Sequence, residues 1–187
     1  YRAALMLNLI GADWSPIFVD FFVKGEQRTP EYRANINEMG EVPVLVHGTA
    51  TESGRISTEE VLAALDIHAQ AAIKPIAPGE LALVPTALLC PGLQRLLDAR
   101  RVIGLRNPAH SLVKIMKPCL GQALVVSSYT HPEYAISMGQ TFELIKADAL
   151  LLRGTEGEVV ADARRTPQME AFVKGKRMLL QASQPGT

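Results

Sequence analysis

The sequence is poor in cysteine and in aromatic side chains, and it carries no net charge. Its 187 residues include 2 cysteines, 5% aromatic residues, and 19 basic against 19 acidic side chains. Cys90 and Cys119 are too few for a disulfide framework or a four-cysteine zinc site, so we expect two buried, reduced thiols. The balanced charge favours no class of partner, and a hydrophobic content of 48% argues against global disorder.

Long apolar runs and targeting segments are also absent. No stretch reaches the roughly 20 apolar residues that a membrane-spanning helix requires. The chain shows no signal peptide, and it starts at Tyr1 instead of methionine. We therefore expect Tyr1 to mark a truncation and not the natural N-terminus. These features predict a cytoplasmic protein with no membrane partner.

The sequence contains no phosphate-loop, dinucleotide-binding or zinc-protease motif. Its histidines are scattered without metal-ligand spacing, at His47, His68, His110 and His131. The segment 153–162, "RGTEGEVVAD", gathers carboxylates just after a predicted strand, where α/β proteins bind ligands. Such a cluster could hold Mg²⁺, but a solvated acidic loop has the same composition and is favoured. We therefore predict no metal site.

Apolar periodicity, capping residues and turn signals alternate between helix and strand along the chain. Helices are predicted over 1–12, 29–39, 57–67, 90–104 and 131–147, and strands over 15–23, 42–48, 80–85, 122–128 and 148–154. The clearest helix start is Ser57 followed by Glu60, the pattern of a capping box. This alternation predicts an α/β fold, with a mostly parallel sheet and helices on both faces.

One segment of this neutral chain has an excess of positive charge. Residues 95–117, "RLLDARRVIGLRNPAHSLVKIMK", hold six basic side chains and one acidic one. A helix, a loop and a second helix would place Arg101, Arg106, Lys114 and Lys117 on one surface. Arginine forks suit phosphate groups, and the segment has no aromatic side chain for stacking on bases. It predicts contacts to phosphates that tolerate any base sequence, although a solvated helix face is the simpler alternative.

Three segments within residues 1–47 form a pattern: "YRAALMLNLIGADW", "FVDFF" and "GEQRTPEYRANINEMGEVPVLV". They resemble the thioredoxin-like N-terminal domain of bacterial glutathione transferases. The resemblance implies that Val42 and a cis Pro43 bind the cysteinyl part of glutathione, and that Glu52 and Ser53 of "TESG" hold its γ-glutamyl end. In that family the catalytic Ser, Cys or Tyr would precede Tyr1, and nothing after residue 70 resembles the helical second domain.

Five segments within residues 42–187 form a second pattern: "VPVLVHG", "GRISTEEVLAALDI", "LVPTALLCPGLQRLLDARRVIGLRNPAHSLVK", "YTHPEYA" and "LLLRGTEGEVVADARRTPQ". They resemble the nucleic-acid-binding relatives of anthranilate phosphoribosyltransferase, which implies the larger α/β domain of that fold. In the enzymes an Asp-Glu pair binds Mg²⁺ where this chain has Val159 and Val160, so phosphoribosyl transfer is not expected. Together with the basic segment, the resemblance predicts nucleic-acid contacts at Arg100, Arg101, Arg106, His110, Lys114 and Lys117.

The segment "VPVLVHG" belongs to both patterns, so we interpret the chain as a chimera. Residues 1–41 would be a truncated glutathione-transferase-like βα segment, and residues 42–187 a truncated phosphoribosyltransferase-like α/β domain. A buried parallel strand with the same inward-facing residues can follow the preceding helix of either family. Such a junction is therefore physically reasonable. The alternative is one continuous α/β domain.

Three functions remain open at this level. The first is a non-catalytic phosphoribosyltransferase-like domain that binds DNA or RNA through phosphates and needs no cofactor. The second is a glutathione transferase-like protein that uses glutathione. The third is a chimeric structural protein without activity. Neither active site is complete, so the question of enzymatic activity stays open. Whether the chain forms a homodimer is a separate open question.

Overall fold

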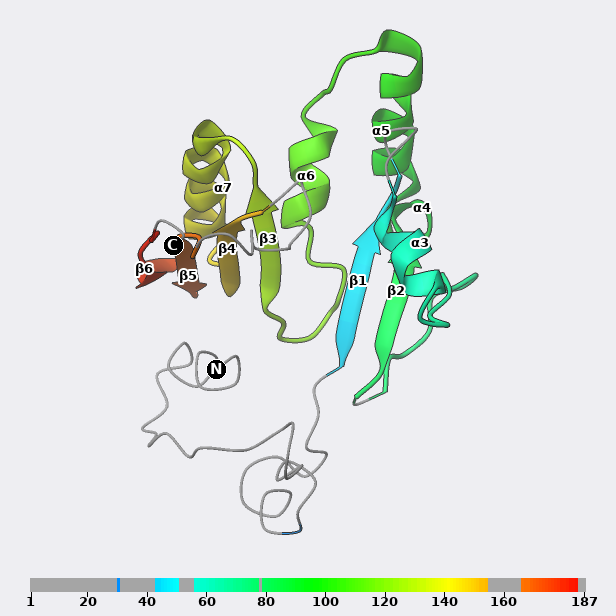
Figure 1. Ribbon diagram of the computed structural model, residues 1–187, viewed down its shortest axis with the longest axis horizontal. Helices are drawn as coiled ribbons and strands as arrows, with labels where there is room; N and C mark the ends of the chain where they lie inside the picture. The colour runs from blue at the N-terminus through cyan, green and yellow to red at the C-terminus, as the bar shows by residue number, and fades with distance from the viewer. Residues whose placement is uncertain (1–29, 31–42, 51–55, 78, 155–165, 185–187) are drawn as a thin grey trace. The chain divides into compact units, whose positions relative to one another are not determined.

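The computed structural model describes residues 30, 43–50, 56–77, 79–154 and 166–184. They divide into two compact units, which we call the N-terminal unit, up to residue 107, and the C-terminal unit, from residue 108 (Figure 1). The predicted elements over 1–12 and 15–23, nearly all of 29–39, and the predicted domain boundary after residue 41 lie outside the described residues. The division at residue 107 falls inside the domain predicted over 42–187.

The N-terminal unit is built on a small parallel sheet. Its described elements are β1 (Val44–Gly48), α3 (Thr58–Ala63), β2 (Leu81–Pro85), α4 (Thr86–Leu89) and α5 (Pro91–Ile103). The two strands pair in parallel with Val44 opposite Leu81. Buried side chains of β2 and of α5 form the apolar interior, with Leu97 of α5 only 2% exposed.

Capping residues set the helix ends of this unit as the sequence predicts. The Ser57 hydroxyl accepts a hydrogen bond from the Glu60 amide, while the Glu60 carboxylate accepts one from the Ser57 amide, which completes the capping box. The Glu60 carboxylate accepts hydrogen bonds from the Ser57 amide and also from the Ser57 hydroxyl, and these two bonds lower the pKa of Glu60. Helix α3 ends at Ala63, earlier than predicted, and Asp66 then adopts a left-handed conformation with φ of 61°.

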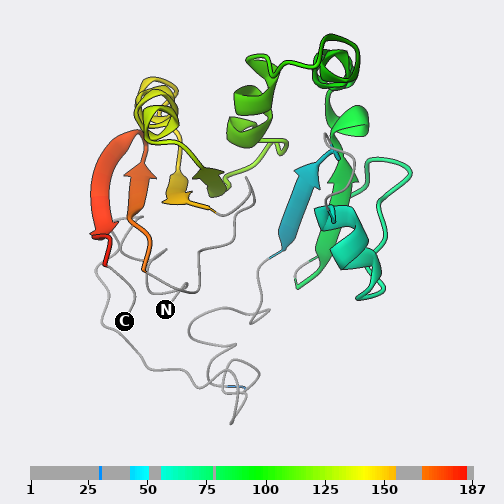
Figure 2. The same cartoon turned by 45° about the horizontal axis from the view of Figure 1, so that its top comes forward.

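The C-terminal unit contains a four-stranded mixed sheet. Its elements are α6 (Ala109–Ile115), β3 (Val125–Tyr129), α7 (Pro132–Leu144), β4 (Ala149–Arg153), β5 (Met169–Val173) and β6 (Lys176–Gln181). The strand order is β3-β4-β5-β6, with β3 and β4 parallel and the other two pairings antiparallel. Figure 2 shows α6 and α7 on one side of this sheet.

The core of the C-terminal unit lies between this sheet face and α7. Phe142 of α7 and Phe172 of β5 are fully buried, and their ring centroids lie 5.3 Å apart. Alternate residues of the strands point to this face, including Tyr129, Ala149 and Leu151. The unit is therefore held together by aromatic and aliphatic contacts between elements that are far apart in the sequence.

A tight turn joins β5 to β6. Lys174 and Gly175 have φ values of 48° and 80°, the left-handed pair that two-residue hairpin turns require. The Lys174 amide donates to the Asp148 carboxylate over 2.8 Å, and the Gly175 amide donates to the Ala147 carbonyl over 3.0 Å. These bonds dock the turn against the connection between α7 and β4.

The described fold confirms the mixed α/β class and corrects its details. The prediction of a mostly parallel sheet is wrong, because β4–β5 and β5–β6 are antiparallel, as many pairings as the parallel β1–β2 and β3–β4. For β5–β6 the physical reason is the two-residue turn, which brings the chain straight back. Helices on both faces were also expected; among the described residues, α6 and α7 contribute side chains to one core on the same face of the four-stranded sheet, and the expectation for the whole chain stays a prediction.

The cysteines and the helix lengths complete this picture. Neither Cys90 nor Cys119 is in a disulfide, as predicted, but Cys119 is exposed and Cys90 only half-buried, so the expectation of two buried thiols is wrong. Among the described residues, every helix is too short or too polar to cross a bilayer.

Candidate nucleic-acid interface

The basic side chains of the N-terminal unit lie on and just after α5. Leu97 anchors this helix in the interior, so the residues on its other sides face outwards. Arg95 and Arg101 are exposed, and Arg100 is half-buried. Helix α5 ends at Ile103 and is capped by Gly104, a left-handed residue with φ of 75° whose amide donates to the Arg100 carbonyl.

One face of α5 contacts the residues that follow β1. Gln94 donates from its amide nitrogen to the Thr49 hydroxyl over 3.2 Å and to the Asp98 carboxylate over 3.1 Å. Arg101 donates to the Ala50 carbonyl over 3.4 Å. These contacts hold α5 at the carboxyl end of the parallel β1–β2 pair, the edge where α/β sheets bind ligands.

The Arg101 guanidinium is oriented by its neighbours but remains accessible. Its Nε lies 3.8 Å from an Asp98 carboxylate oxygen, and 66% of the Arg101 side chain is exposed. An exposed ion pair of this length contributes little to stability, about 0 to 1 kcal/mol. Asp98 therefore orients the guanidinium without preventing a contact with an incoming phosphate.

The loop after α5 is tied back onto the helix. The Asn107 side-chain nitrogen donates to the Leu96 carbonyl over 2.6 Å. This bond fixes the loop that carries Arg106, an exposed residue. Arg106 is therefore held by the same local framework as Arg100 and Arg101. Sequence reasoning placed these arginines together but did not identify Asn107 or Gln94, whose roles depend on the folded contacts.

The remaining residues of the predicted set belong to the C-terminal unit. Lys114 donates to the Ser128 carbonyl over 3.2 Å and is half-buried, because α6 packs along β3. Lys117 is exposed and donates to the Gly121 carbonyl over 3.0 Å. His110 is half-buried. The six predicted residues are thus divided between two units, and one surface shared by all of them stays a prediction.

The predicted glutathione site falls mostly outside the described residues. Val42, Glu52 and Ser53 are not described, and Pro43 is an exposed residue directly before β1. The carboxylate segment after Arg153, including Val159, is not described either. Within the described ranges, no group of three or more His, Cys, Asp or Glu side chains is placed to hold a metal ion.

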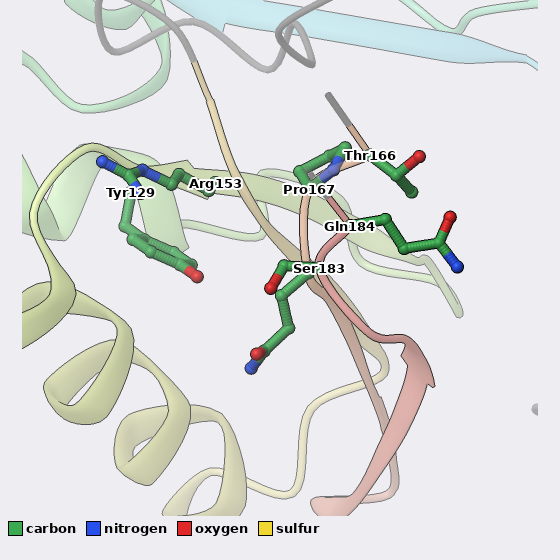
Figure 3. A pocket seen from close by; sticks show the side chains of 7 residues that line it. Tyr129, Arg153, Thr166, Pro167, Ser183 and Gln184 are labelled. Atoms are coloured by element: carbon green, nitrogen blue, oxygen red, sulfur yellow. The ribbon is translucent and has the colours of Figure 1, made fainter. Parts of the chain in front are cut away.

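A pocket that the sequence did not predict lies in the C-terminal unit. It occupies about 320 Å³ near the carboxyl ends of β3 and β4. Figure 3 shows the Tyr129 ring beside Arg153, with its hydroxyl directed toward the side of the pocket formed by Ser183. The sequence carried little signal for it, because its lining comes from segments separated by many positions.

Comparison with known proteins finds a relative in Escherichia coli. The chain is 35% identical over 157 residues to a protein of that organism named "Uncharacterized protein YbiB". The match covers 81% of this chain and 49% of that protein, so the chain spans about half the length of the relative. No family model matches the chain.

Proposed function

We propose that the chain is a non-catalytic domain that binds nucleic acid by its phosphates, with α5 and the following loop as the contact surface. The observation that carries this proposal is the Asn107–Leu96 hydrogen bond, which fastens the Arg106 loop to the helix that bears Arg100 and Arg101. Three arginines are thereby carried by one segment of tied backbone, with Arg101 and Arg106 exposed and Arg100 half-buried. DNA and RNA are the partners, and no cofactor is required.

The chemistry of this surface favours phosphates over bases. A guanidinium offers several donors in a planar fork that fits phosphate oxygens. Binding releases counterions from the nucleic acid, so affinity falls steeply as salt rises. The segment 95–107 carries no aromatic side chain on which a base would stack. Binding should therefore tolerate any base sequence.

The proposal of a non-catalytic, cytoplasmic protein rests on the sequence. The resemblance to phosphoribosyltransferase relatives points to the binding function, while Val159 and Val160 offer no oxygen ligands for the Mg²⁺ that the enzymes use. We also propose, from the sequence resemblance alone, that residues 1–41 are a truncated thioredoxin-like segment. A cytoplasmic location agrees with the two unpaired cysteines, since disulfides are rare in that compartment.

The test is a titration of a labelled duplex, followed by fluorescence anisotropy at several salt concentrations. The variant is Arg101→Gln/Arg106→Gln, and the matched control is Lys174→Gln/Lys176→Gln, which removes the same number of charges from two exposed residues of the C-terminal unit. We expect the log–log salt slope to decrease in magnitude by about 0.9 for each phosphate that the variant no longer neutralises. The control should bind like the unmodified chain, and duplexes of unrelated sequence should bind equally well.

Two results would reject the proposal. One is an affinity for the duplex that does not depend on salt. The other is an affinity of the double variant equal to that of the control at every salt concentration. A strong preference for one base sequence would reject the phosphate-only mode and require base contacts.

A further inference from the structure

The pocket of the C-terminal unit has walls that are fixed by the backbone. Its lining consists of Tyr129, Arg153, Thr166, Pro167, Gln168, Ser183 and Gln184. Thr166 and Gln184 exchange both backbone hydrogen bonds, over 3.2 and 3.0 Å. On the opposite side, the Gly154 amide donates to the Tyr129 carbonyl over 3.0 Å, which holds the ends of β3 and β4 together.

The polar groups that line this pocket are complementary to an anion. They are one guanidinium, three hydroxyl groups and two side-chain amides, with no carboxylate among the described lining residues. The nearby buried acid, Glu170, is already paired, because Arg177 donates to both of its oxygens over 2.8 Å. Arg153 is the one charged side chain among these described lining residues, so together they carry a single positive charge.

Two neighbouring side chains are positioned as neutral hydrogen-bonding groups. Tyr129 is only 9% exposed, and burial together with the Glu170 carboxylate raises the pKa of its phenol. The hydroxyl is therefore protonated at neutral pH and can donate a hydrogen bond to a ligand. Gln168 donates to Glu170 over 2.8 Å, which fixes its amide at the wall of the pocket.

We propose that this pocket binds a small molecule through its oxyanion, with Arg153 as the counter-ion and the Tyr129 hydroxyl as a hydrogen-bond donor. A volume of about 320 Å³ exceeds that of a bare phosphate and leaves room for a short carbon body. The oxyanion is that of a phosphate ester or of a carboxylate, since a guanidinium pairs with both. This site lies in the C-terminal unit and does not depend on the proposed nucleic-acid surface on α5.

The test uses the full 187-residue chain and amide chemical shifts of Gln168 and Gln184. The probes are glycerol 3-phosphate, glycerate and, as a neutral control, glycerol. Saturable shifts with the first probe identify a phosphate site, and saturable shifts with the second identify a carboxylate site. Shifts with glycerol equal to those with the anions, or no shifts with any probe, would overturn the proposal.

Variants then link the binding to the named residues. Arg153→Met should raise the dissociation constant by at least about tenfold, because it removes a charged hydrogen-bond donor. Tyr129→Phe keeps the ring in the core and should weaken binding a few-fold. Lys176→Met removes an exposed charge of the same unit away from the pocket lining and should leave binding unchanged. Equal affinities for Arg153→Met and Lys176→Met would refute the assignment.

Discussion

Replacing Gly175 by alanine tests how the C-terminal hairpin is docked. A Cβ atom at this position would lie 2.6 Å from the Glu143 carbonyl oxygen and 2.9 Å from the Lys146 Cα. Both neighbours are backbone atoms, so they cannot move aside as a side chain would. In addition, the φ of 80° costs an alanine about 1–2 kcal/mol.

The overlap can be relieved only if the turn moves away from the α7–β4 connection. That movement would weaken the Gly175–Ala147 and Lys174–Asp148 hydrogen bonds, each of which contributes about 1 kcal/mol. We therefore expect Gly175→Ala to lower the free energy of unfolding by about 3 kcal/mol, at the upper end of ordinary single substitutions.

Gly139→Ala is the matched control for this prediction. It adds the same methyl group inside α7, where the nearest atom would be Cζ of Phe172 at 3.5 Å, an ordinary van der Waals contact. Because glycine is a poor helix former, this substitution should stabilise the unit by about 0.5–1 kcal/mol. Urea unfolding followed by circular dichroism measures both effects, and hydrogen exchange at the Phe172 amide reports on the C-terminal unit alone. Equal stabilities of the two variants would refute the reasoning.

Further predictions concern charged and capping contacts. Arg177→Met should lower the free energy of unfolding by about 1.5–3 kcal/mol, because it leaves the buried Glu170 carboxylate without its charged donor. A urea midpoint equal to that of Lys176→Met would contradict this. Ser57→Ala should destabilise the N-terminal unit by about 1 kcal/mol because it removes the N-cap, measured in the same way. Because folding lowers the pKa of Glu60, its carboxylate stabilises the folded state above pH 4.5, and this contribution is lost as pH falls through the pKa of the folded state. Amide hydrogen exchange in α3 should therefore become faster in acid, and Glu60→Gln should remove this acid dependence.

Several elements of this fold could be predicted because their signals are local. The capping box at Ser57, the proline at the start of α5 and the glycine at its end each act within a few residues. The strands β1, β2, β3 and β4 were identified within a few residues of their observed bounds, since apolar runs between turn signals mark buried strands.

In the candidate sites, too, the local features could be predicted from the sequence, while the contacts between distant residues could not. The charge of the segment 95–117 is a property of composition, and the exposure of Arg101 and Arg106 agrees with it. The attachment of Lys114 to the Ser128 carbonyl could not be read from the sequence, because it depends on α6 packing along β3. The role of Asn107 was missed for a similar reason: its acceptor is a backbone carbonyl eleven positions earlier.

The sequence by itself determined the order of helices and strands from β1 to β4 and the location of its positive charge, because periodicity, capping and charge are local properties; it did not indicate β5 and β6. Only the tertiary structure decided the antiparallel half of the second sheet, the pairing of Glu170 with Arg177 and the pocket beside Tyr129. The physical reason is that these features are made by atoms from distant segments. The free energy that stabilises them comes from apolar burial and ion pairing. Both exist only once α7 has packed on the sheet, with Phe142 against Phe172.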